Sequence, residues 1–137
     1  MKKLLVGLMV AAAMVTFGCG GRNADFGTVD MAKVQAEAPI MKTLNEEMAK
    51  KATELRKEAE EAMAKAGDDQ AAQQKAQEDY VAKSQLVQSE ASAKLKSSLD
   101  AALNQVAQEK KLGAILVKQA VPQGGVDVTA DVIAKMK

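Results

Sequence analysis

Two long stretches of strong helix formers, separated by a three-residue break, dominate this sequence and constrain its fold. Alanine, glutamate, lysine, methionine and leucine prevail from Lys33 to Ala66 and again from Gln70 to Lys111, and these residues favour helices. In the break, Gly67-Asp68-Asp69, glycine can end one helix and an aspartate can cap the next. We therefore expect an antiparallel helical hairpin. Its continuous first helix should begin at Pro39, whose ring removes a backbone donor, with a separate turn of helix before it.

Apolar residues recur at alternating steps of three and four along both predicted helices, which is the spacing of a coiled-coil seam. The first series is Met41, Leu44, Met48, Ala52, Leu55, Ala59, Ala62 and Ala66, and the second is Tyr80, Val87, Ala91, Leu95, Leu99, Ala102 and Val106. The larger side chains gather away from the break, and alanine predominates near it. Because burial energy scales with apolar area, we expect the hairpin to be firm at its base and loose at its tip.

Short β-prone segments flank the predicted hairpin. They comprise Phe26–Met31, Ala114–Val117 and Val126–Thr129, with a turn at Pro122-Gln123-Gly124-Gly125 before the last one. We expect one small sheet that forms a base (26–38 and 112–137) for a helical arm (39–111), followed by a short helix, Ala130–Met136, capped by Thr129. A sheet of this size is not stable alone, so oligomerisation is expected.

The N-terminal residues predict export. Met1-Lys2-Lys3 and the apolar run Leu4–Phe17 have the pattern of a secretory signal over residues 1–18, and the run is shorter than the roughly 20 residues that span a bilayer. Thr16-Phe17-Gly18-Cys19 resembles the lipobox of bacterial lipoproteins, which implies acylation of Cys19 and a tether over 19–25. The alternative is an ordinary cut near Gly18 or Gly20 that leaves a free thiol. In enteric bacteria, an aspartate directly after the lipobox cysteine marks retention at the inner membrane. Here Gly20 stands at that position, which favours an anchor in the outer membrane.

Charge and composition exclude several classes of function. The 19 basic residues include Lys2 and Lys3, so removal of residues 1–18 leaves 17 against 18 acidic ones, without the basic excess of a nucleic-acid binder. The chain has no histidine and one cysteine, which excludes His-dependent nucleophilic catalysis and the usual zinc clusters. We expect neither an enzyme nor a cofactor. Paired acidic residues such as Glu46-Glu47 are interpreted as solvated helix surface.

Three segments have distinctive sequences. They are Val29-Asp30-Met31 ahead of a helix, Leu112-Gly113-Ala114-Ile115-Leu116-Val117 after the second helix, and Asp127-Val128-Thr129-Ala130-Asp131-Val132 at the last helix. Together they resemble the Skp/OmpH family of periplasmic chaperones. The resemblance implies a homotrimer whose sheet bases associate while three hairpins enclose a cavity. It also implies a holdase that binds unfolded outer-membrane proteins in the periplasm without ATP. Strand alternation and this resemblance together assign six residues to the sheet base and the trimer contact: Val29, Met31, Ile115, Val117, Val126 and Val128.

The tip of the arm and Cys19 depart from this family. Its well-studied members are soluble and carry basic residues toward the arm tips, whereas this tip is Gly67-Asp68-Asp69, so electrostatic capture of clients and a lipopolysaccharide site are not expected. An anchor on Cys19 would hold the protein at the membrane. The second hypothesis is therefore a structural envelope lipoprotein that acts as a coiled-coil spacer or scaffold.

Overall fold

The structure is a computed structural model that describes residues 25–137. The chain order is β1 (Phe26–Val29), α1 (Met31–Glu37), α2 (Pro39–Ala66), α3 (Gln70–Glu109), β2 (Ala114–Val117), the 3-10 helix η1 (Lys118–Ala120), β3 (Val126–Asp127) and α4 (Thr129–Lys135). The predicted mainly helical fold with one small sheet is confirmed. The predicted signal peptide, Cys19 and the tether up to residue 24 lie outside the described residues.

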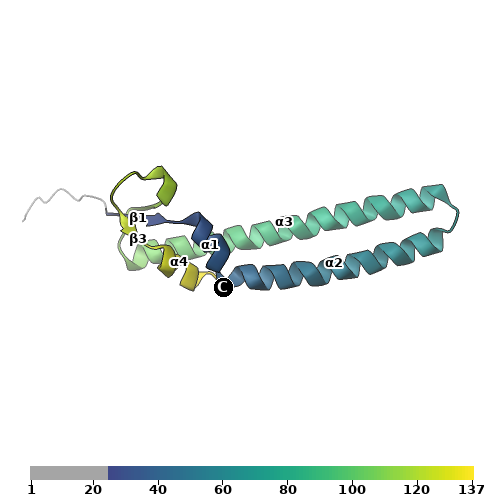
Figure 1. Ribbon diagram of the computed structural model, residues 1–137, viewed down its shortest axis with the longest axis horizontal. Coiled ribbons are helices and arrows are strands. Elements are labelled where there is room, and N and C mark those ends of the chain that lie inside the picture. The colour runs from purple at the N-terminus through teal and green to yellow at the C-terminus, as the bar shows by residue number, and fades with distance from the viewer. Residues whose placement is uncertain (1–24) are drawn as a thin grey trace, which may run out of the picture.

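Two long helices, α2 and α3, extend side by side from a base that holds the strands and short helices (Figure 1). As predicted, α2 begins at Pro39, because the residue before a proline avoids the helical conformation and Ala38 is extended there (ψ 128°). Gly67 follows the last residue of α2 as its C-cap, with a φ of +52°. Asp69 then caps α3 by accepting hydrogen bonds from the backbone amides of Ala71 and Ala72.

The sheet has the order β2-β1-β3, and both pairs are parallel. Its register aligns Phe26 with Ala114 and Val29 with Val117. A parallel pair needs a long crossover, and here α1, α2 and α3 together connect β1 to β2. Gly27 in the central strand is closely approached, since a β-carbon there would lie 2.9 Å from a methyl of Leu112.

The hydrophobic core lies where the base meets the adjoining ends of α2 and α3. Its buried residues are Val29, Val34, Ala38, Ile40, Leu44, Ala102, Val106, Val128, Val132 and Met136. Among residues 45–101, which form the rest of the helix pair, Ala76 is the one buried residue. Apolar burial is therefore concentrated at the base and is sparse along the arm.

Two expectations about the base were wrong in detail. Met31 begins α1 and is not in a strand, because the Asp30 side chain accepts hydrogen bonds from the amides of Ala32 and Lys33 and caps that helix. Thr129 is the first residue of α4 and does not cap it. Its hydroxyl instead donates to Asp127 at 2.6 Å and accepts from the Asp30 amide at 3.0 Å. Thr129 thus ties the two ends of the described chain together.

Two residues of the predicted seam are more exposed than their spacing indicated. Ala52 is exposed, because the contact between the helices passes through Met48 and Leu55, which are partly buried, and leaves Ala52 to one side. Tyr80 is also exposed, although it borders the same small hollow as Leu55 and Ala59. The seam is therefore narrower in the middle of the arm than at the base.

Candidate functional site

The six residues assigned to the sheet base divide into an inner and an outer set. Val29 and Val128 are buried in the core. Met31 and Ile115 are half-buried and pack against it. Val117 and Val126, in contrast, have exposed fractions of 41% and 48%. Of the six, the outer pair is the most exposed and is the best placed for a contact with another chain.

The two outer strands bring these exposed valines to the edges of the sheet. β1 is central, so β2 and β3 each have one neighbour within the described chain. Leu116 in β2 is exposed as well, at 43%. Uncovered strand edges with apolar side chains favour pairing with another chain. The candidate association surface of the base therefore lies at β2 and β3.

A polar network fixes the position of β3 relative to the rest of the base. Asp127 accepts hydrogen bonds from the Thr129 amide at 3.0 Å, from the Thr129 hydroxyl at 2.6 Å and from the Lys118 ammonium at 2.9 Å. These donors stabilise the charged carboxylate, and the Thr129 hydroxyl has the largest effect; together they hold the pKa of Asp127 far below its ordinary value. The network joins η1, β3 and α4.

Three ion pairs cross between the long helices. Glu47 pairs with Lys94 at 2.6 Å, Lys51 with Glu90 at 2.6 Å, and Glu58 with Lys83 at 2.5 Å. Residue numbers rise along α2 as they fall along α3, so the two helices run antiparallel. In each pair the partner's hydrogen bond shifts a pKa: Lys94 lowers that of Glu47, Lys51 lowers that of Glu90, and Glu58 raises that of Lys83.

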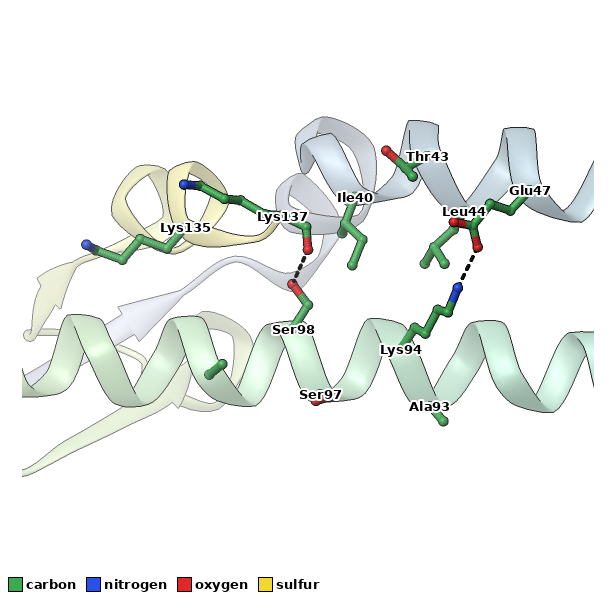
Figure 2. Close-up of a pocket in the computed structure, with 11 residues that line it drawn as sticks. Ile40, Thr43, Leu44, Glu47, Ala93, Lys94, Ser97, Ser98, Lys135 and Lys137 are labelled. Carbon is green, nitrogen blue, oxygen red and sulfur yellow. Dashed lines mark hydrogen bonds and ion pairs between the residues drawn. The ribbon is translucent and has the colours of Figure 1, made fainter.

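A groove of about 680 Å³ opens where α2, α3 and the end of α4 meet. Figure 2 shows Ile40 and Leu44 on α2 facing α3, with the Glu47–Lys94 ion pair at one end of the groove. At the other end, the Ser98 hydroxyl donates to the backbone carbonyl of Lys137 at 3.3 Å. Spacing indicated that Leu44 belongs to the seam, but the groove depends on how α4 is placed and was not predicted.

Within residues 25–137, no group of three or more acidic, histidine or cysteine residues is arranged to hold a metal ion. None of the helices in that range combines the length and apolarity needed to cross a membrane. Comparison of the chain with models of protein families and with curated proteins finds no match.

Proposed function

We propose that the protein is an ATP-independent holdase of the Skp/OmpH type that binds unfolded outer-membrane proteins in the periplasm. The observation that carries this proposal is that the fold separates a packed core at one end from a long, open pair of helices. The core lies in a small base and in the adjoining ends of α2 and α3, while the rest of α2 and α3 projects from it with most of its surface uncovered (Figure 1). At about 1.5 Å per residue, the 40 residues of α3 extend roughly 60 Å. Arms of this length can surround a client.

The proposed assembly is a homotrimer in which the bases associate and three helical hairpins enclose the client. Exposed Leu116, Val117 and Val126 at the outer strands support this arrangement, because burying them in a contact would remove apolar surface from water. The sparse burial along the arm also supports it, since a weakly packed helix pair can bend around clients of different size.

A refolding assay tests the proposal. A denatured outer-membrane β-barrel protein is diluted out of urea with or without the purified mature protein, whose mass is measured by light scattering. We expect a trimeric mass and suppression of client aggregation at about one trimer per client. Aggregation that proceeds unchanged at several-fold excess of a confirmed trimer would contradict the proposal.

The second candidate is a structural envelope lipoprotein whose helix pair acts as a spacer. The three ion pairs that brace α2 against α3 favour it, as does the lipobox-like Cys19. Cross-linking in cells distinguishes the two functions: many barrel precursors cross-linked to the arm support the holdase, whereas one fixed envelope partner supports the spacer. Fatty-acid labelling, compared with Cys19→Ala, tests the anchor, and equal labelling of both forms would exclude acylation at this residue.

A further inference from the structure

The two sides of the long helix pair differ in chemistry. On α2, the ion-paired residues Glu47, Lys51 and Glu58 are separated by four and seven residues, and on α3, Lys83, Glu90 and Lys94 by seven and four. Steps of four and seven return to nearly the same face of a helix with 3.6 residues per turn. The three ion pairs therefore lie on one side, which we call the ion-paired flank.

The opposite side carries uncharged residues. Lys51 and Ala52 differ by about 100° around α2, with the contact residues Met48 and Leu55 between them. On α3, Gln88 and Glu90 lie on either side of Val87 and Ala91 in the same way. Uncharged residues that share a face with Ala52 or Gln88 by spacing include Asn45 and Met63 on α2, and Gln77 and Val81 on α3. We call these six residues the uncharged flank; all six are exposed.

Two charged residues border this flank. Arg56, four residues after Ala52, forms an exposed ion pair with Glu60 at 3.1 Å, and Glu78, which lines the same hollow as Gln77 and Val81, accepts a hydrogen bond from the Gln74 amide at 2.9 Å. The six residues of the flank themselves offer no counter-charge to a charged ligand, which would lose hydration here. Methionine and valine can contact apolar side chains, and thioethers repack readily. The glutamine and asparagine amides both donate and accept hydrogen bonds, which suits the unpaired backbone of an extended chain. The complementary partner is thus an uncharged, extended polypeptide.

We propose that the uncharged flank is the surface of the arm that holds the client, and that it binds extended segments in which apolar and small polar side chains alternate. This inference rests on the proposed holdase function and specifies its binding surface. Transmembrane strands of outer-membrane barrels have this alternation, with few charges on their lipid-facing side. The ion-paired flank faces away from the client.

Leu86 provides a matched control, because it is as apolar as the residues of the uncharged flank but lies on the other side. It follows Lys83 by three residues and precedes Glu90 by four, so it belongs to the ion-paired flank. Its exposed fraction is 59%, compared with 47% for Val81 and 42% for Met63. Apolar exposure alone would therefore favour Leu86 as a client contact, whereas the proposed flank favours Val81 and Met63.

The test compares the full mature protein with two double variants, Met63→Glu/Val81→Glu on the uncharged flank and Leu86→Glu/Ala93→Glu on the ion-paired flank. Ala93 follows Leu86 by seven residues, so it lies on nearly the same face of α3, and it is also exposed. The probe is a fluorescently labelled, urea-denatured barrel protein, and binding is measured by titration. We expect the first variant to bind roughly tenfold more weakly, because a glutamate must be desolvated against an uncharged partner, and the second to stay within about twofold of wild type. Circular dichroism and light scattering check that helicity and mass are unchanged.

The possible outcomes distinguish failure of the flank assignment from failure of the holdase function. In one outcome the wild type binds the client and both double variants weaken binding equally, and in another the Leu86 variant weakens it more. Either result overturns the flank assignment and leaves the holdase function standing. A changed oligomeric mass for Met63→Glu/Val81→Glu with client binding retained shows that another copy of the chain covers this flank, and overturns it as well. Absence of wild-type binding overturns the holdase function and the flank assignment with it.

Discussion

A single hydroxyl at Thr129 links the N-cap residue of α1 to the start of α4. Thr129 is buried, and its hydroxyl accepts from the Asp30 amide while donating to Asp127. We expect Thr129→Val to lower the free energy of unfolding by about 1–3 kcal/mol, because the Asp30 amide is left without its partner. Urea denaturation measures the change. Thr53→Val is the matched control: its hydroxyl bonds to the Ala49 carbonyl on an exposed helix face, and we expect a loss below about 0.5 kcal/mol. Equal losses would contradict the role of Thr129.

Asp127 makes the stability of the base depend on pH. Its pKa in the folded protein lies far below the ordinary value of 3.8, chiefly because the Thr129 hydroxyl donates to it. A carboxyl whose pKa is lowered on folding stabilises the folded state fully at pH values above its unfolded pKa. This contribution to stability is lost as the pH falls from the unfolded pKa toward the folded pKa. We therefore expect wild type to be more stable than Asp127→Asn at pH 7, and this difference to shrink as the pH falls below about 4. Melting temperatures of both forms between pH 7 and 2 measure it. A difference that stays constant with pH would contradict the prediction.

At the scale of elements, the arm should open locally at its tip before its base. Ala76 is the one buried residue among positions 55–80, whereas Leu44, Ala102 and Val106 are buried near the base. Local opening is easiest where few apolar contacts are lost. We expect amides of residues 55–80 to exchange hydrogen at least about tenfold faster than those of 95–109, as measured by native-state hydrogen exchange. Uniform protection along α3 would show that the arm opens as one unit.

The sequence predicts elements where local chemistry decides them. Pro39 and Asp69 set the starts of α2 and α3 through interactions within a few residues, and both were predicted. Thr129 was misjudged because its hydroxyl bonds across 99 positions to Asp30. Ala52 was misjudged because the neighbouring helix decides which side of a seam is covered. For the candidate site, strand alternation and the family resemblance together indicated the six base residues but could not separate buried Val128 from exposed Val126, since that depends on where α4 packs.

At the scale of the whole molecule, the exposed edge of the base and the open arm have complementary roles in the proposed trimer. The exposed strand edges would hold the three copies together, and the arms would bind the client. A base with few core residues gains stability from association, because burying the outer strands removes apolar area from water. Loss of the trimer should therefore also abolish client retention, since one arm cannot surround an unfolded chain.

We expect Val117→Lys/Val126→Lys to convert the proposed trimer into monomers. Two lysines at a contact that excludes water would each lose hydration without a counter-charge, whereas in the monomer both positions are solvent-exposed and the core stays intact. Light scattering measures the mass, circular dichroism checks the helices, and the refolding assay measures client retention. Ala134→Lys is the control, because Ala134 is an exposed residue of α4 in the same base but outside the sheet. It should remain trimeric and active. If the double variant kept the trimer, the contact between copies would lie elsewhere on the base.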